Sequence, residues 1–130
     1  MRSSRMLAVG LAACLAGCFP VHFNACPGAE GRAVDSATAM PIANATVSLT
    51  QRGQGKGRLV KSTTTDSSGR FSFVPEKSWG VYIVPMDFAP LLAEVDVVAP
   101  GYDHATCQAR SFPDGPGIAN CGDIRLNKQP

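Results

Sequence analysis

Five cysteines are the most reactive side chains in this chain of 130 residues. A thiolate can be alkylated, can bind a metal or can pair in a disulfide, and its surroundings decide which of these it does. Cys18 follows Ala16 and Gly17 at the end of an apolar run over residues 6–15. The residues before Cys18 therefore bear on the role of its thiol.

Residues 1–17 have the layout of a secretory signal. Arg2 and Arg5 form a positive head, the apolar run follows, and small residues precede the expected cut. A membrane-spanning helix needs about twenty apolar residues, so this run is too short to span. The alternative, a buried helix that opens the domain, would be stopped almost at once by Pro20 and Pro27. We therefore expect residues 1–17 to be a cleaved signal peptide.

The residues around the cut resemble a more specific signal. Leu15-Ala16-Gly17-Cys18 is similar, residue for residue, to the lipobox of bacterial lipoproteins. The resemblance implies a diacylglyceryl group on the Cys18 thiol, cleavage between Gly17 and Cys18, and acylation of the new amino group by a chain such as palmitate. Several acyl chains, at about 0.8 kcal/mol per buried methylene, anchor a protein firmly. The implied partner is membrane lipid, reached through acylated Cys18.

The residue after Cys18 bears on location. In Gram-negative lipoproteins, Asp at this position favours retention at the inner membrane, whereas this chain has Phe19. The resemblance thus indicates the outer membrane, with the domain facing the periplasm. Residues 18–29 are expected to be the lipidated N-terminus and an irregular tether, interrupted by Pro20, Pro27 and Gly28. Such a tether reaches at most about 35–40 Å.

Three cysteines remain once Cys14 leaves with the signal and Cys18 carries lipid. An exported domain meets an oxidising space in which disulfides persist. We favour Cys107–Cys121, because this bridge would close a loop of about fifteen residues and contribute about 3 kcal/mol. The rival pairing joins Cys26 to Cys107 or to Cys121 and would fasten the tether to the domain.

Two histidines and two tyrosines raise the question of a metal. Intradiol ring-cleaving dioxygenases hold ferric iron with two Tyr and two His, and this chain contains Tyr82, Tyr102, His22 and His104. Those enzymes take both histidines from one short His-x-His strand, whereas these two lie about eighty residues apart. No Cys-x-x-Cys or His pair has the spacing of a tetrahedral site. We expect no metal and no cofactor.

Other catalytic patterns are also missing. The transthyretin-like hydroxyisourate hydrolases need a Tyr-Arg-Gly-Ser-type C-terminus, and residues 125–130 do not match it. Nothing near His104 resembles a nucleophile elbow. Trp79 and Tyr82 could form a small ligand platform, although a single Trp beside an apolar strand is more often core. We expect no enzyme; the alternative is a small hydrolase or metalloenzyme on a transthyretin-like or intradiol-dioxygenase-like fold.

The rest of the chain alternates with the period of a β-strand. Residues 45–50 and 93–97 place apolar side chains at every second position. Residues 58–65 are polar on both faces, as in an edge strand, and the turn at 66–69 predicts a hairpin with 71–73. Shorter runs complete an all-β fold, a small antiparallel β-sandwich of seven to eight strands over residues 30–130. Residues 87–94 are the one helical candidate, and Pro90 interrupts them.

Several of these runs resemble one family of small modules. The segments 31–35, 41–49 and 65–73, with the later Ala99-Pro100-Gly101-Tyr102 and the last run 123–126, are similar to the carboxypeptidase regulatory-like domain. The resemblance covers residues 30–128 and implies a transthyretin-like sandwich. It implies little about function, because modules of this architecture serve many roles.

Charge excludes one class of partner. The chain has 12 Lys and Arg against 10 Asp and Glu, and the surplus consists of Arg2 and Arg5. The mature chain is therefore neutral and lacks the basic clusters that nucleic-acid binding needs. We expect a lipid-anchored module of the bacterial cell envelope with a non-catalytic binding or structural role, which meets a protein, peptide or glycan partner.

Overall fold

The structure of the chain, a computed structural model, describes residues 18–52, 58–83, 91–111 and 117–130. Within these ranges no helix is long and apolar enough to cross a membrane. The described residues form nine strands: β1 (Cys18–Cys26), β2 (Gly28–Asp35), β3 (Thr46–Arg52), β4 (Arg58–Thr64), β5 (Arg70–Phe73), β6 (Glu76–Ile83), β7 (Leu91–Val98), β8 (Ala105–Ser111) and β9 (Ile118–Leu126).

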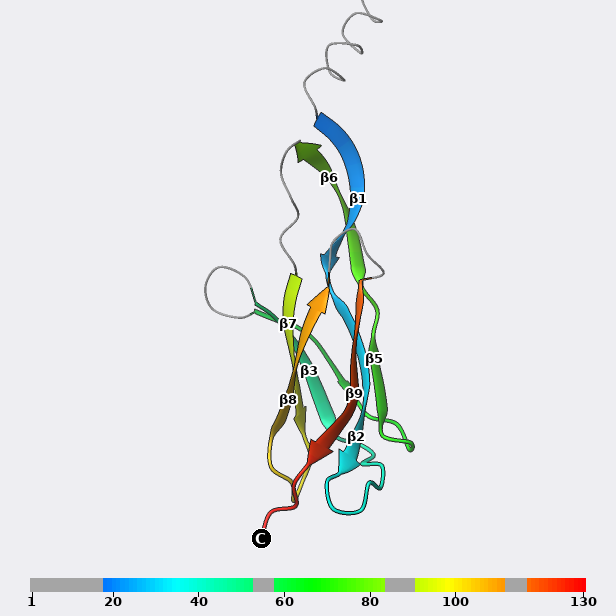
Figure 1. Cartoon of the computed structure of the whole chain (residues 1–130), viewed down its shortest axis with the longest axis vertical. Helices are drawn as coiled ribbons and strands as arrows, with labels where there is room; N and C mark the ends of the chain where they lie inside the picture. The colour runs from blue at the N-terminus through cyan, green and yellow to red at the C-terminus, as the bar shows by residue number, and fades with distance from the viewer. Residues whose placement is uncertain (1–17, 53–57, 84–90, 112–116) are drawn as a thin grey trace, which may run out of the picture.

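Two sheets make a β-sandwich, and a third pair of strands extends from it (Figure 1). One sheet has the strand order β5-β2-β9 and the other has the order β4-β3-β7-β8. The expected all-β sandwich is confirmed. The sheets are not antiparallel throughout, because β2 and β9 run parallel. These strands come from the two ends of the domain sequence, so no short turn constrains their direction.

Alternating side chains fill the space between the sheets. Val47 and Leu49 on β3 and Val95 and Val97 on β7 are fully buried, as the period-two pattern predicts. Each buried Val or Leu contributes about 1.5–3 kcal/mol relative to an exposed one. Leu126 on β9 closes the core from the other sheet. The edge position expected for residues 58–65 is also confirmed, because β4 ends its sheet.

The hairpin expected around residues 66–69 is wrong. The turn is tight, and Gly69 donates its N–H to the carbonyl of Asp66 at 2.9 Å, but β4 and β5 belong to different sheets. The chain crosses at Thr65, whose buried hydroxyl donates to the Ile42 carbonyl at 2.7 Å and accepts the Ala45 N–H at 2.9 Å. These long-range bonds hold the crossing between the two sheets.

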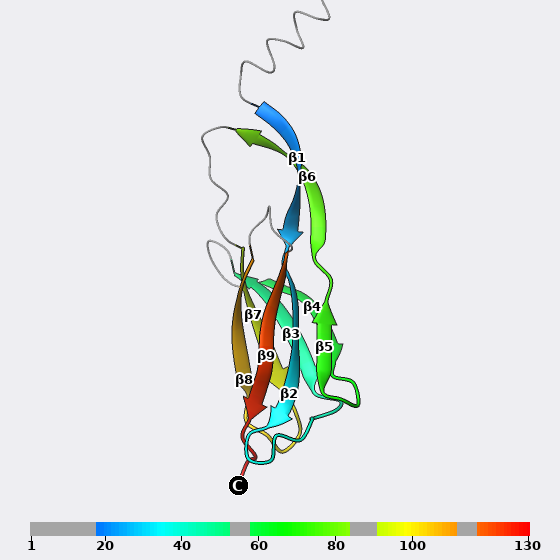
Figure 2. The ribbon, with the colours of Figure 1, turned by 45° about the vertical axis from the view of Figure 1, so that its right-hand side comes forward.

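The segment expected to be an irregular tether is instead paired. Residues 18–26 form β1, which runs antiparallel to β6, and β2 begins directly after Pro27. This two-stranded ribbon projects from one end of the sandwich, and the C-terminus lies at the opposite end (Figures 1 and 2). The helical candidate is also wrong over residues 91–94, which belong to β7; residues 87–90 lie outside the described ranges.

Candidate functional site

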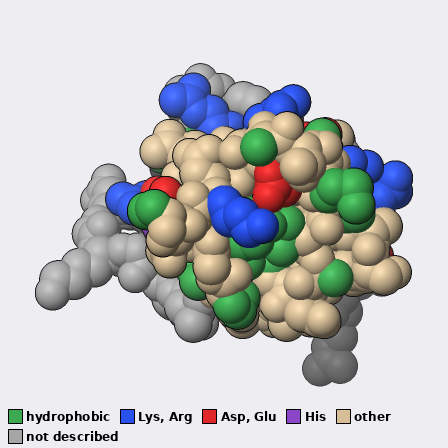
Figure 3. Space-filling model, turned by 90° about the horizontal axis from the view of Figure 1, so that it is seen from below, with side chains coloured by type: hydrophobic (Ala, Val, Ile, Leu, Met, Phe, Trp, Pro, Cys, Tyr) green, Lys and Arg blue, Asp and Glu red, His purple; other side chains and the backbone are tan. Residues whose placement is uncertain are grey.

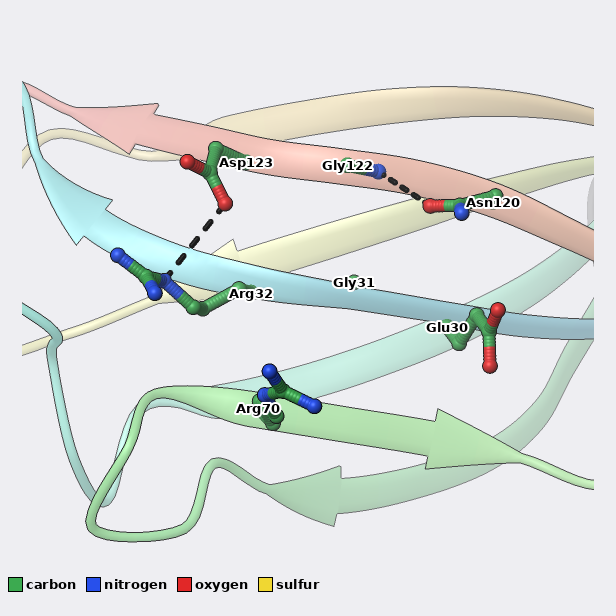
Figure 4. A pocket seen from close by; sticks show the side chains of 7 residues that line it. All are labelled: Glu30, Gly31, Arg32, Arg70, Asn120, Gly122 and Asp123. Carbon is green, nitrogen blue, oxygen red and sulfur yellow. Dashed lines mark hydrogen bonds and ion pairs between the residues drawn. The ribbon is translucent and has the colours of Figure 1, made fainter.

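A shallow hollow of about 320 Å³ lies on the outer face of the β5-β2-β9 sheet. Charged and amide side chains line it, together with two glycines (Figure 4). The lining residues are Glu30, Gly31, Arg32, Arg70, Asn120, Gly122 and Asp123. None of these residues has an apolar side chain, so this is a surface for polar recognition.

Strand alternation on β2 explains why these side chains face outward. Ala29 and Ala33 are fully buried in the core, so the residues between them at even positions, Glu30 and Arg32, point to the other face. Gly31 lies on the core side: a Cβ there would come within 2.8 Å of the Phe71 ring. The sequence of β2 thus supplies two charged groups to one open face.

A β-bulge on β9 completes the hollow. The register between β2 and β9 shifts between Glu30 and Arg32, so that β9 carries an extra residue opposite β2. Gly122 takes a φ of 60° there, which glycine adopts without strain. Its N–H donates to Asn120 Oδ1 at 2.8 Å. Bulges re-aim side chains beside functional sites, and this one brings Asp123 into register with Arg32.

A row of charges crosses the three strands at this level. Arg32 lies between Asp123 on β9 and Arg70 on β5, and all three are paired in register. Arg32 Nε lies 3.6 Å from Asp123 Oδ1, and this buried nitrogen has no hydrogen-bond partner among the described residues. Two arginines directly opposite each other repel. The row therefore presents two guanidinium groups, one of which has a buried Nε without a hydrogen-bond partner among the described residues.

The Asp66 turn places a second carboxylate near Arg70. Hydrogen bonds from the Ser68 hydroxyl and from the Arg70 N–H hold the pKa of Asp66 below its usual 3.8, and the positive charge of Arg70 adds to this effect. Asp66 Oδ1 accepts these bonds at 2.7 and 2.9 Å. Asp66 is therefore ionised at neutral pH, and it offsets part of the repulsion between the two arginines.

The balance of groups limits what the hollow can do. Arg32 and Arg70 face Glu30 and Asp123 among the lining residues, so the lining is neutral overall. The lining contains both donors and acceptors, and no hydroxyl, thiol or imidazole lines the hollow to act as a nucleophile. The arrangement suits recognition of a group with both donors and acceptors, such as a peptide backbone or a sugar.

In the described part of the chain, the end of the molecule that holds the C-terminus has no large patch of one charge. Seen from the end that holds the C-terminus, basic and acidic side chains form small separate groups among polar atoms (Figure 3). This distribution agrees with the equal count of basic and acidic residues from Cys18 onward.

The favoured disulfide is present. Cys107 and Cys121 are bonded, with their Cα atoms 6.0 Å apart. The bridge joins β8 to β9 and so links the edges of the two sheets. Both rival pairings with Cys26 are thereby excluded. Cys26 is buried, and its Sγ lies 3.7 Å from the carbonyl of Pro27. Cys18 is the first residue of β1.

The structure does not assemble the two histidines into one site. His22 lies on β1 in the ribbon, whereas His104 precedes β8 at the opposite end of the molecule (Figure 1). His104 Nε2 lies 3.0 Å from Asp96 Oδ1. The hydroxyl of Tyr102 donates to Asp35 Oδ2 at 3.0 Å. Within the described ranges, no group of three or more His, Cys, Asp or Glu side chains could hold a metal ion.

The expectation that Trp79 belongs to the core is wrong. Its side chain is 72% exposed and stacks on the ring of His22, with ring centroids 4.8 Å apart and an angle of 21° between the planes. The two residues are direct partners in the β1–β6 register. Sequence reasoning placed Trp79 beside an apolar strand, but the partner of that strand is β1 and not a core strand.

Sequence reasoning also missed the residues of the polar hollow. Glu30 and Arg32 alternate with small residues, a pattern that marks one solvent-facing side of a strand. Their meeting with Arg70 and Asp123 depends on the parallel β2–β9 pair and on the bulge. Neither feature has a local sequence signal beyond Gly122.

No protein-family model matches the chain, and no curated protein matches it. Among solved structures, it is similar to 3-chlorocatechol 1,2-dioxygenase from Rhodococcus opacus 1CP, with 14% identity and a TM-score of 0.48 over 82% of this chain and 61% of that one. It is similar to the shaft pilin SpaA from Lactobacillus rhamnosus GG, with 14% identity and a TM-score of 0.48 over 80% of this chain and 46% of the pilin.

The C-terminal domain of that pilin gives 14% identity and a TM-score of 0.47 over 84% of this chain and 99% of the domain. The chain thus spans less than two thirds of the dioxygenase and less than half of the whole pilin. At this level of similarity, the strand pairings of the chain itself define it as a β-sandwich.

Proposed function

We propose that this chain is a lipid-anchored β-sandwich module of the bacterial cell envelope with a non-catalytic binding or structural role. The observation that carries the proposal is the lipobox-like Leu15-Ala16-Gly17-Cys18, which ends where the first strand begins. Cleavage before Cys18 would leave the thiol at the free end of β1. Acyl chains on that residue would hold the sandwich at the membrane surface without a spanning segment.

Phe19 after the lipidated residue favours the outer membrane, with the sandwich facing the periplasm. The disulfide Cys107–Cys121 supports an exported location, because such bonds persist in oxidising compartments. The runs 31–35 and 65–73 further support a carboxypeptidase regulatory-like module of transthyretin-like type. A small hydrolase or metalloenzyme is the alternative, and no catalytic constellation among the described residues favours it.

Lipid incorporation tests the anchor. Cells that express the wild-type chain, Cys18→Ser or Cys14→Ser would be fed a clickable palmitate analogue, and the purified chains would be compared. We expect label on the wild type and on the matched control Cys14→Ser, and none on Cys18→Ser. An unlabelled wild type, or equal label on Cys18→Ser, would remove the basis of the proposal.

The polar hollow on β2, β5 and β9 is the surface that we assign to partner binding. Its two arginines and its neighbouring carboxylates offer hydrogen-bond donors and acceptors that match the groups of a protein, peptide or glycan. A photo-crosslinking residue at exposed Glu30 should give a defined adduct in intact cells, whereas one at exposed Thr46 on the other sheet should not. Arg32→Ala should weaken the Glu30 adduct. Adducts of equal yield at both positions would argue against this surface.

A further inference from the structure

The β1–β6 ribbon lies apart from the sandwich. Among the described strands, β1 pairs only with β6, and the pair projects beyond both sheets (Figures 1 and 2). The register runs from Cys18–Ile83 at the free end to Cys26–Glu76 at the sandwich, about 26 Å at 3.3 Å per residue. An isolated two-stranded ribbon is marginally stable in water, so an element of this length calls for a supporting surface.

Residue types change in order along the ribbon. The sandwich end carries the only charged residues of the two strands, Glu76 and Lys77, which pair with Cys26 and Asn24. Beyond them comes the pair Phe23–Ser78, whose serine is polar, and after it the pairs contain one histidine and otherwise apolar, aromatic or glycine residues. From the middle to the free end these pairs are His22–Trp79, Val21–Gly80, Pro20–Val81, Phe19–Tyr82 and Cys18–Ile83.

Trp79 marks the transition between the two halves. Its indole is 72% exposed although the chain has a core large enough to bury other aromatic rings, such as those of Phe71 and Phe73. It stacks on His22 instead. Tryptophan has an apolar body and one polar N–H, and it concentrates where membrane meets water. A surface of this kind would cover the indole and still leave its N–H hydrated.

Cys18 stands at the free end of the ribbon, four residues before His22 along β1. We infer that the apolar half of the ribbon lies in the interfacial layer of the bilayer, with Trp79 at the level of the lipid headgroups. This inference rests on the proposed anchor at Cys18, because the acyl chains fix which end of the ribbon meets the membrane. The ribbon then sets the distance and tilt of the sandwich, which a flexible tether would not do.

Trp79 is the single tryptophan of the chain, so its fluorescence reports on this contact alone. The lipidated protein, purified from membranes, would be reconstituted in phosphatidylethanolamine and phosphatidylglycerol vesicles and recovered by flotation. The control is Met40→Trp in a Trp79→Phe background, since Met40 is exposed at the far end of the sandwich. Emission, quenching by iodide in water and quenching by lipids with a nitroxide near the headgroup would be compared.

We expect blue-shifted emission from Trp79, strong quenching by the nitroxide lipid, and an iodide quenching constant several-fold lower than that of the control. Protein that floats but shows equal iodide quenching at both positions overturns this inference and leaves the anchor intact. Trp79 that is protected from iodide but insensitive to nitroxide lipids also overturns it, and indicates a protein contact such as a second copy. Protein that carries no lipid and does not float overturns the anchor and the inference with it.

Discussion

Asp35 is a buried carboxylate that holds one end of the sandwich together. Its side chain accepts the N–H groups of Ala37 at 2.8 Å and Thr38 at 3.1 Å, and the hydroxyl of Tyr102 at 3.0 Å. The Thr38 N–H has the largest effect, and together these bonds hold the pKa of Asp35 below its usual 3.8. The same contact raises the pKa of Tyr102, because the protonated phenol donates a hydrogen bond to the Asp35 carboxylate.

This geometry predicts part of the acid stability. A carboxyl group with a lowered folded pKa stabilises fully above its unfolded value of about 3.8, and this contribution is lost as pH falls through the folded pKa. Asp35→Asn should therefore lower the urea midpoint at neutral pH and flatten the decline of this midpoint as pH falls below about 3.8. Asp103→Asn, at an exposed aspartate, is the control. Equal acid slopes for wild type and Asp35→Asn would contradict this role.

Two glycines with nearly the same backbone conformation allow steric cost to be separated from backbone strain. Gly69 has a φ of 75°, and a Cβ there would lie 2.5 Å from the Ala33 carbonyl oxygen. Gly101 has a φ of 79°, and a Cβ there would meet nothing within 4 Å. Gly101→Ala should cost about 1 kcal/mol from strain alone, and Gly69→Ala should cost clearly more. Similar unfolding free energies for both variants would show that the turn relaxes freely.

At the scale of elements, the two open sides of the sandwich are closed differently. On one side the disulfide joins β8 to β9. On the other, Lys61 of β4 reaches across to the Val74 carbonyl at 2.9 Å and to Glu76 at 3.2 Å. A lysine on an edge strand also discourages pairing with another chain. The exposed ion pair contributes little to stability, so the covalent side carries more of the closure.

Loss of the bridge should show this difference. Cys107→Ala combined with Cys121→Ala should lower the unfolding free energy by about 3 kcal/mol, because the unfolded chain regains the entropy of a loop of about fifteen residues. Dithiothreitol should destabilise the wild type to a similar extent and leave the double variant unchanged. Lys61→Met should cost much less. A double variant as stable as the oxidised wild type would assign closure to packing alone.

Strand periodicity predicted the elements better than it predicted their partners. Residues 45–50 and 93–97 became β3 and β7 with the expected buried faces, since alternation follows from local pattern. The hairpin at Asp66 was wrong because the same turn residues also serve a crossing between sheets. The ribbon was missed although Phe19, Val21 and Phe23 alternate with Pro20, His22 and Asn24; two prolines hid this pattern.

The candidate site shows the same limit. Outward-facing Glu30 and Arg32 follow from alternation, but their union with Arg70 and Asp123 needs both the β2–β5 and the β2–β9 pairings. The disulfide was predictable in part, because the three cysteines that would remain after the proposed cleavage and lipidation allow few possible bridges. Loop length already favoured Cys107–Cys121, and the positions of β8 and β9 at the two sheet edges explain why this pairing forms.

For the whole molecule, the ribbon and the sandwich follow each other along one axis. The strand β1 begins at Cys18, the ribbon extends from there to the sandwich, and the C-terminus lies at the far end (Figure 1). If the module is anchored at Cys18, the β5-β2-β9 face would lie along the side of the molecule, between its membrane end and its C-terminal end. Its neutral charge from Cys18 onward leaves the proposed lipid contact as the main source of membrane affinity.

The intact mass of the chain isolated from membranes tests this account most directly. Our proposal predicts a chain that begins at Cys18, contains one disulfide and carries the added mass of a diacylglyceryl group, with or without a third acyl chain. Mild alkaline hydrolysis should remove the ester-linked part of that mass and leave the polypeptide unchanged. A chain that still contains residues 1–17, or one that begins elsewhere with no added lipid mass, would contradict the central claim.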